Sequence, residues 1–298
     1  MRSSRFLMIS GICLLVGAGV ALAQGRPLAT YLNIDPPGAT TATAYGINAQ
    51  GNIVGQYTDA GNVTHGFLLT ADGYRTIDYP DAKGTDARGI SETGEIVGNY
   101  WPVSGDVALP TGIHGYLLTT DGAFTSPGHF DGSPENPHSH SIAQRILPDG
   151  MILGCIHDGN MTTTMQGLIT GNGVYEVRDA MGSMDNGATP DLGMIVGSYM
   201  DGTVTKGYTV IDGAFTPFAI AVDGTNLTQA WDVNPKGEIV GVYRVGSVAH
   251  GYVLRANALT LVDYPGASQT RAFGINPLGN VVGSYVAGGV THAFLLLR

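Results

Sequence analysis

Short apolar segments alternate along the chain with turns rich in glycine, asparagine and aspartate, and one such combination recurs. Its first copy opens with Gly46-Ile47-Asn48, continues through Ile53-Val54-Gly55 and ends in His65-Gly66-Phe67-Leu68-Leu69. From residue 24 to residue 298, no stretch sustains the 3.6-residue apolar period of an amphipathic helix. The pattern therefore predicts an all-β chain built from repeated strands, without helices.

The glycine of the Ile-Val-Gly step marks each copy and sets the period. A spacing in the low forties suits a unit of four short strands joined by hairpin turns. In the first copy we expect strands ending at residue 48 and covering 52–57, 65–70 and 74–79. The marker glycines are expected to let adjacent backbones approach closely. They occur six times, at Gly55, Gly98, Gly154, Gly197, Gly241 and Gly283.

The two ends of the repeat pattern indicate a ring. The last copy stops at residues 292–296, which correspond to a third strand, and no fourth strand follows. Residues 29–37 (ATYLNIDPP) resemble the fourth strands at 74–80 (YRTIDYP) and 259–265 (LTLVDYP). A ring pairs these two edges, whereas an open solenoid leaves both exposed. We therefore predict a six-bladed β-propeller, four strands per blade, closed by pairing of the N-terminal strand with the C-terminal blade.

The first 23 residues have the features of a secretory signal peptide, and residues 24–298 are expected to form one domain. Arg2 and Arg5 precede an apolar run, and Ala21-Leu22-Ala23 is a small-x-small cleavage site. A retained membrane anchor is the alternative. Cleavage near Ala23 predicts an exported protein, in periplasm or medium, with no transmembrane segment. Because Cys13 would be removed, Cys155 would remain alone and form no intramolecular disulfide.

The charge balance narrows the classes of partner. The chain holds 24 acidic and 14 basic residues, for a net charge of −10. An acidic chain of this kind does not suit nucleic acid or an anionic membrane surface as its partner. With 43% hydrophobic residues and 13% charged ones, it is expected to fold rather than to remain disordered.

The repeated phrase resembles a bacterial family of extracellular repeats named for its His-Ala-Phe (HAF) signature. The last copy reads His292-Ala293-Phe294, and the resemblance extends over residues 29–298. The resemblance implies an extracellular location, but it implies no particular activity. Copies three and four depart from the pattern, because Arg145-Ile146-Leu147 and Ala188-Thr189-Pro190 replace Gly-Ile-Asn, and Gln166 and Lys206 replace the histidine.

Four histidines and three aspartates recur with the repeat and are interpreted as structural. Each histidine begins a third strand, where it is expected to satisfy the same backbone group in every blade, with a ligand-facing role as the alternative. The aspartates are expected to cap strand ends rather than to act as paired catalytic carboxylates. The histidines are His65, His114, His250 and His292, and the aspartates are Asp35, Asp78 and Asp263.

Two insertions supply the candidate site. One lies between the second and third strands of the second copy, and the other follows in residues 126–141. Both links leave the same face of a four-stranded meander, so the insertions are predicted to crown one sector of a rim. His129, His138 and His140, with nearby carboxylates, have the ligand types of a zinc or copper site, and a solvated loop is the alternative. The rim candidates are Trp101, Asp106, His129, Asp131, Glu135, His138 and His140.

No sequence motif supports nucleophilic or nucleotide chemistry. A G-x-S-x-G elbow and a phosphate-binding glycine loop are missing, and Cys155 lies in an apolar strand, where a thiol is expected to be an inert core residue. No cofactor is identified. The sequence therefore favours an exported binding or interaction module that recognises a carbohydrate, an envelope component or a protein. A metal-assisted hydrolase or lyase and a structural envelope protein without a small ligand are the alternatives.

Overall fold

The computed structural model describes residues 29–102, 112–126, 140–157, 165–171, 174–178, 180 and 182–298. Over these ranges the chain is all-β, as the repeat pattern predicted, and its one helical element is the 3-10 turn η1 (Pro190–Leu192). No helix in this part of the chain is long and apolar enough to cross a membrane.

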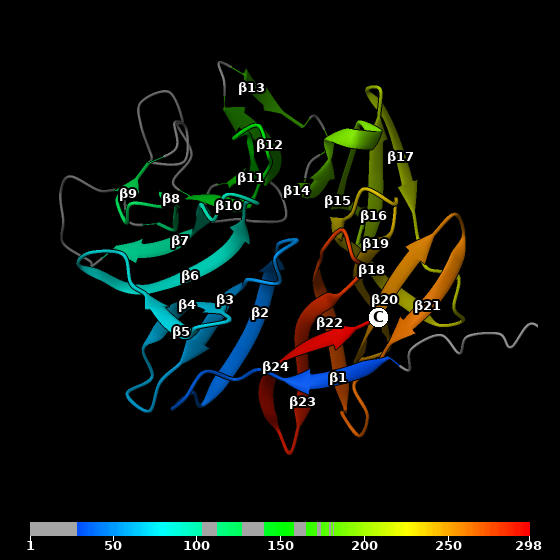
Figure 1. Ribbon diagram of the computed structural model, residues 1–298. Coiled ribbons are helices and arrows are strands. Elements are labelled where there is room, and N and C mark those ends of the chain that lie inside the picture. Colours follow the sequence, from blue (N-terminus) through cyan, green and yellow to red (C-terminus); the bar gives the residue numbers. More distant parts are fainter. Residues whose placement is uncertain are drawn as a thin grey trace, which may run out of the picture.

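The strands form antiparallel meanders in which consecutive strands pair (Figure 1). Four sheets have four strands each, and the fifth joins two meanders through a single parallel pair, Thr205 with Leu227. The first three meanders are β2 (Thr41–Ile47), β3 (Ile53–Thr58), β4 (Thr64–Thr70) and β5 (Gly73–Ile77); β6 (Ala82–Ile90), β7 (Ile96–Pro102), β8 (His114–Leu118) and β9 (Phe124–Thr125); and β10 (His140–Ile146), β11 (Ile152–His157), β12 (Gln166–Gly171) and β13 (Val174–Val177).

The remaining strands continue the same order. The joined meanders are β14 (Met184–Thr189), β15 (Met194–Asp201), β16 (Val204–Ile211) and β17 (Ala214–Phe218), then β18 (Thr225–Val233), β19 (Ile239–Val245), β20 (Val248–Arg255) and β21 (Ala258–Val262). The last sheet holds β22 (Gln269–Ile275), β23 (Val281–Ala287), β24 (Val290–Leu297) and the N-terminal strand β1 (Thr30–Asn33). The strands predicted for the first copy agree with β2 to β5 within two residues at each end.

Strand β1 completes the last sheet from the other end of the chain. It runs antiparallel to β24, with Thr30 opposite Leu297 and Asn33 opposite Phe294. The Oδ2 atom of Asp35 then lies 2.6 Å from Nδ1 of His292 in β24. The predicted pairing of the N-terminal strand with the C-terminal sheet is therefore confirmed.

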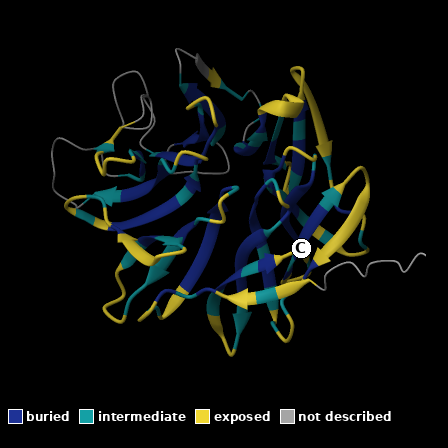
Figure 2. Ribbon diagram, in the orientation of Figure 1, coloured by how far each residue is buried: buried dark blue, intermediate teal, exposed yellow. Residues whose placement is uncertain are grey.

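The first strands of the meanders lie at the centre of the molecule and contact one another in sequence order. Strand β2 contacts β6, and the contacts continue through β10, β14 and β18 to β22, which contacts β2 again. Figure 2 shows that these inner strands are buried, whereas exposed residues concentrate in the turns and in outer strands such as β17 and β21. The centre is thus a packed axis surrounded by sheets.

In three of the six repeats the asparagine of the Gly-Ile-Asn phrase bonds one meander to the next. Asn48 Nδ2 donates to the Ser91 carbonyl at 3.1 Å, and Asn234 Nδ2 donates to the Asn276 carbonyl at 3.1 Å. Asn276 Nδ2 donates to the Asn48 carbonyl at 3.2 Å, which links the last meander to the first. The asparagine therefore clamps neighbouring sheets at these three junctions, whereas Ser91, Leu147 and Thr189 occupy its place in the other repeats.

The marker glycines make room within each sheet. A Cβ atom on Gly283 would lie 1.9 Å from the Arg271 carbonyl oxygen and 2.8 Å from the Phe294 ring. No side chain fits there without moving the first strand or displacing the aromatic ring of the third. The expected close approach of backbones is confirmed, and the approaching backbone belongs to the neighbouring strand of the same sheet.

Cys155 in β11 is a fully buried free thiol, and burial raises its pKa well above the ordinary 9.0. Above pH 9.0 the thiol ionises in the unfolded chain and stays protonated in the folded one, so stability is lost as the pH rises. The gap in unfolding free energy between the wild type and Cys155→Ala should shrink by about 1.4 kcal/mol per pH unit above pH 9. Urea denaturation at pH 8, 9.5 and 10.5 measures this gap, and a constant gap would contradict the buried, protonated thiol.

Candidate functional site

Each first strand carries a β-bulge just before the end of the strand. In β2 the register shifts between Ala44 and Gly46, and the other five first strands shift at the equivalent place. A bulge redirects the side chain that follows it. The residues that follow the bulges are Gly46, Gly89, Arg145, Gly187, Asp232 and Gly274.

Arg145 crosses the axis and is held by backbone carbonyls from several strands. Its side chain is 8% exposed, and its Nε lies 3.4 Å from Oδ2 of Asp232. Both terminal nitrogens donate to two carbonyl oxygens each, from β2, β6, β22 and Arg145's own strand. Nη1 donates to Arg88 and Gln144 at 2.7 and 3.0 Å, and Nη2 donates to Tyr45 and Phe273 at 2.9 and 2.6 Å.

Asp232 is fixed as firmly as its partner. Its Oδ1 accepts the Val233 N–H at 2.9 Å, and its Oδ2 accepts the Ile275 N–H from β22 at 3.1 Å. Burial raises the pKa of the Asp232 carboxyl, and the Arg145 guanidinium counteracts this rise. The pair therefore ties β10, β18 and β22 together across the axis.

Glycines opposite the pair leave the space that it needs. A Cβ atom on Gly187 would lie 2.7 Å from Asp232 Cα, and one on Gly89 would lie 2.9 Å from Arg145 Cα. First strands can approach the axis this closely only where most of these positions lack a side chain. The glycine of the Gly-Ile-Asn phrase therefore shapes the centre of the molecule.

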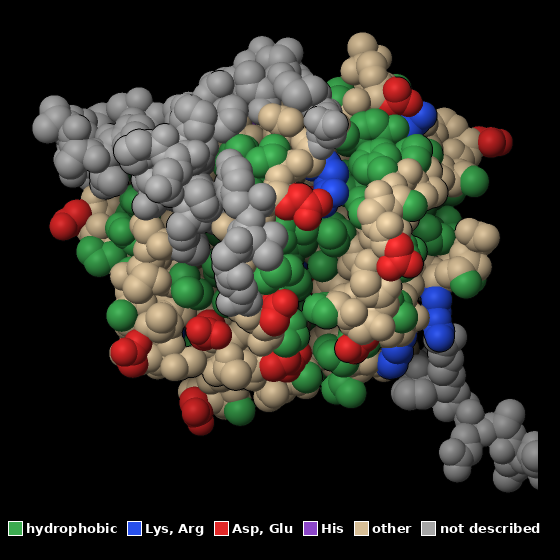
Figure 3. Space-filling view, turned by 90° about the horizontal axis from the view of Figure 1, so that it is seen from above, with side chains coloured by type: hydrophobic (Ala, Val, Ile, Leu, Met, Phe, Trp, Pro, Cys, Tyr) green, Lys and Arg blue, Asp and Glu red, His purple; other side chains and the backbone are tan. Residues whose placement is uncertain are grey.

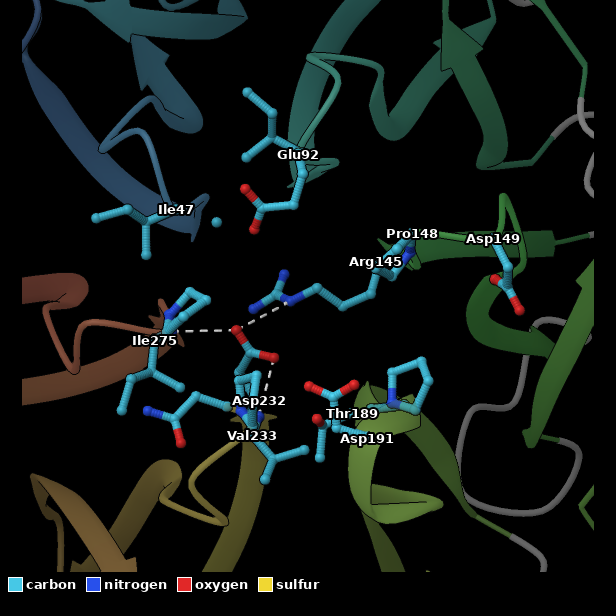
Figure 4. A pocket seen from close by; sticks show the side chains of 17 residues that line it. Ile47, Glu92, Arg145, Pro148, Asp149, Thr189, Asp191, Asp232, Val233 and Ile275 are labelled. Carbon is cyan, nitrogen blue, oxygen red and sulfur yellow. Dashed lines mark hydrogen bonds and ion pairs between the residues drawn. The ribbon is translucent and has the colours of Figure 1, made fainter.

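A cavity of about 260 Å³ opens over the charged pair, at the end of the axis where first and second strands are joined. Figure 4 shows its side chains contributed by strands from all sides of the axis, with Arg145 and Asp232 in the middle. Its walls include Ile47, Ile275 and several turn prolines. We call this cavity the axial pocket.

Acidic and hydroxyl groups face the axial pocket. The carboxylates of Glu92 and Asp191 turn toward the space in Figure 4, whereas Asp149 turns away. The Glu92 oxygens accept the Ala49 N–H at 3.1 and 3.2 Å, which fixes that side chain. Thr189, 3% exposed, lines the pocket with an Oγ1 atom that has no hydrogen-bond partner among the residues described.

The predicted rim site lies mostly outside the described residues. Asp106, His129, Asp131, Glu135 and His138 all fall there. Trp101 lies in β7 opposite Gly84 and is partly buried. His140 begins β10, where its Nδ1 accepts the Ile113 N–H at 3.1 Å and its ring stacks on His157 at 4.7 Å. Within the ranges that the structure covers, no group of three or more His, Cys, Asp or Glu side chains could hold a metal.

Three of the four recurring histidines, His65, His250 and His292, contact carboxylates rather than a common backbone group. His65 Nδ1 lies 2.8 Å from Asp78, and His250 Nδ1 lies 3.1 Å from Asp263. The prediction of a shared backbone partner is therefore wrong for these histidines, because their partner is an aspartate carboxylate. The recurring aspartates do more than cap strand ends. Each accepts a hydrogen bond from a histidine of the same sheet, and Asp35 also accepts one from the Ala293 N–H.

Sequence reasoning missed the residues of the axial pocket, because a charged residue in place of the repeated glycine counted only as a departure from the pattern. Arg145 and Asp232 stand where the phrase places glycine, and a charge at a recurring glycine position indicates a distinct role at the axis. In the fourth copy, the residues predicted to replace Gly-Ile-Asn are wrong by one position along the chain. Gly187-Ala188-Thr189, not Ala188-Thr189-Pro190, occupies the Gly-Ile-Asn place, since Gly187 follows the bulge.

The visible surface agrees with the acidic composition. On the side seen in Figure 3, acidic side chains are scattered among apolar and neutral ones, and basic side chains are few. The net charge is −10. A cationic partner is therefore favoured over an anionic one at long range.

Comparison with known proteins supports the architecture and no more. No family model matches the chain, and no curated protein matches it. Among solved structures, Trypanosoma rangeli sialidase in complex with the inhibitor DANA is 9% identical, with a TM-score of 0.52 over 87% of this chain and 54% of that one. This chain spans 54 to 59% of the length of the three sialidase chains compared.

Two neighbours of similar length have the same level of likeness. The β-propeller domain of the Trilobed protease from Pyrococcus furiosus is 11% identical, with a TM-score of 0.52 over 86% of this chain and 95% of that one. The Aleuria aurantia lectin in complex with Fucalpha1-6GlcNAc is 10% identical, with a TM-score of 0.52 over 86% and 91%. At these identities the likeness shows the fold alone, an all-β chain of the β-propeller kind.

Proposed function

We propose that the chain forms a closed six-bladed propeller and is exported. Six repeat copies, the pairing of β1 with β24 and the contact of β22 with β2 support the ring. The signal-like residues 1–23 and the resemblance to the HAF repeats support export. In a closed ring of this kind the N-terminal strand pairs with the edge of the last sheet, so the two ends of the chain leave no incomplete blade.

The function supported best is that of a binding module for a protein or a carbohydrate, with the axial pocket as its ligand site. The observation that carries this proposal is the arrangement at the axis. A buried ion pair forms a rigid floor, and Asp191 and Thr189 offer polar atoms that make no hydrogen bond with the described part of the chain. Concave sites with a few fixed polar groups on a rigid scaffold are typical of ligand binding. The predicted rim site remains a second prediction.

A blocked pocket tests this proposal. The protein is screened on a glycan array and a displayed peptide library, and each hit is then measured with Pro148→Trp, which places an indole at the pocket mouth. Leu278→Trp is the matched control, because Leu278 is 64% exposed and lies in an equivalent turn without lining the pocket. We expect Pro148→Trp to weaken binding at least tenfold and Leu278→Trp to leave it within twofold. Equal binding by both variants would place the ligand elsewhere.

A further inference from the structure

We propose that the axial pocket binds an aliphatic primary ammonium group, carried by a lysine side chain of a partner protein or by a free polyamine. This inference rests on the proposed function and names the chemistry of its ligand. It follows from which polar groups of the pocket are already engaged and which are not.

The cation at the floor is largely engaged and is poorly placed to serve an anionic ligand. A guanidinium has five N–H donors. Four of those on Arg145 donate to backbone carbonyls, and the fifth, at Nε, faces Asp232 at 3.4 Å. An incoming carboxylate or phosphate would therefore find only the Nε–H, which makes no hydrogen bond with the described residues but already faces the Asp232 carboxylate, and it would meet acidic side chains at the rim.

The groups that remain for a ligand are acceptors. Asp191 has no hydrogen bond or ion pair within the described ranges, and Glu92 uses its carboxylate only on the Ala49 N–H. Each Glu92 oxygen has a further lone pair. Figure 4 shows both carboxylates on the pocket side, so an ammonium with three N–H donors matches this set.

Thr189 gives an independent indication that the pocket holds a ligand. Its side chain is 3% exposed, and its Oγ1 lacks a partner among the residues described. A buried hydroxyl without a hydrogen bond is unfavourable by about 1–3 kcal/mol. Figure 4 places Thr189 beside Asp191, on the side of the pocket that faces Asp232, where a bound donor would satisfy it.

The walls suit the carbon chain of such a ligand. The apolar part of the lining includes Ile47, Val233, Ile275 and the ring of Pro277. Pockets for drug-sized ligands have volumes of roughly 300–1,000 Å³. The axial pocket, at about 260 Å³, is smaller, which favours a single aliphatic side chain over a large ring system.

Three five-carbon probes test the inference by isothermal titration calorimetry at low ionic strength: 1,5-diaminopentane, pentane-1,5-diol and glutarate. We expect the diamine to bind at least tenfold more tightly than the diol, and glutarate not to bind. Asp191→Asn combined with Glu92→Gln should weaken diamine binding at least tenfold. Asp223→Asn, an exposed aspartate in the link between β17 and β18, is the matched control and should change it less than twofold.

The source of the ammonium is resolved by a fourth probe, acetyl-Gly-Lys-Gly-amide. Tighter binding of the peptide than of the diamine assigns the pocket to a protein lysine, and the reverse order assigns it to a polyamine. Preference for the diol or glutarate, no binding of any probe, or diamine binding unchanged in the double variant would overturn the inference. If Pro148→Trp still blocks a screened ligand that the double variant binds normally, the pocket is the binding site and only the ammonium assignment fails.

Discussion

Replacement of Arg145 by methionine is expected to lower the free energy of unfolding by about 3–5 kcal/mol, the usual cost of breaking a buried ion pair. The substitution leaves the Asp232 carboxylate buried without its counterion. It also removes donors from the carbonyls of Tyr45, Arg88 and Phe273 on three other strands. Chemical denaturation followed by tryptophan fluorescence or circular dichroism measures the loss.

Two comparisons separate the geometry of the axis from its charge. Arg145→Lys keeps the charge, but a single ammonium with three donors cannot replace a planar fork that reaches carbonyls on several strands, so we expect most of the loss to persist. Arg145→Met with Asp232→Leu should lose less than Arg145→Met alone, because no unpaired charge remains. Arg75→Met, at an exposed arginine in β5, should change stability by less than about 0.5 kcal/mol. A loss below 1 kcal/mol for Arg145→Met would contradict the axial role.

Deletion of residues 29–39 is expected to lower the melting temperature by at least roughly 10 °C, which for a chain of this size corresponds to several kcal/mol. The deletion removes the β1 ladder, the buried Ile34 and the ring of Tyr31, which packs at 5.3 Å on Tyr264. It also removes the Asp35 carboxylate from His292. The exposed edge of β24 should then promote association, visible as oligomers by size-exclusion chromatography.

Deletion of residues 24–28, which precede β1, is the matched control and should leave the melting temperature unchanged. A synthetic peptide of residues 29–39 should restore part of the lost stability to the shortened chain, since it supplies the same strand in trans. A shortened chain that stays monomeric and melts within about 2 °C of the full chain would show that β1 does not complete the last sheet.

Much of the architecture could be predicted from the sequence because its signals are local. A tight turn or a close backbone approach requires glycine at a fixed position, so Gly55 and its equivalents mark every repeat and set its length. The N-terminal strand could be assigned because its aspartate recurs before proline, and the Asp35–His292 contact repeats the pairing of Asp78 with His65.

The candidate site could not be predicted in the same way, because it depends on residues brought together from far apart in the chain. Arg145 and Asp232 meet only when the first strands surround an axis, and a β-bulge in each strand sets which side chain faces it. A bulge leaves no fixed residue type in the sequence, since the bulged positions hold residues as different as Tyr45, Gln144 and Trp231.

The recurring histidines show a further limit of sequence reasoning. Their spacing indicated a repeated role, which His65, His250 and His292 share, but it did not reveal the partner. His65 is the second residue of β4, and Asp78 lies just beyond the end of β5, so the pair forms only through the register of one hairpin. A shift of that register would have brought another side chain opposite the histidine.

The proposed ring requires the N-terminal strand to lie beside the last strand in register, and a cross-strand disulfide tests this directly. Leu32 and Leu295 are opposite each other, so Leu32→Cys with Leu295→Cys, in a chain carrying Cys13→Ser, should oxidise to one intramolecular bond identifiable by peptide mass spectrometry. Closing a loop of roughly 260 residues should stabilise the fold by on the order of 5 kcal/mol. Leu32→Cys with Val290→Cys, out of register on the same strand, should stay reduced. Equal oxidation of both pairs, or of neither, would contradict the proposed closure of the ring.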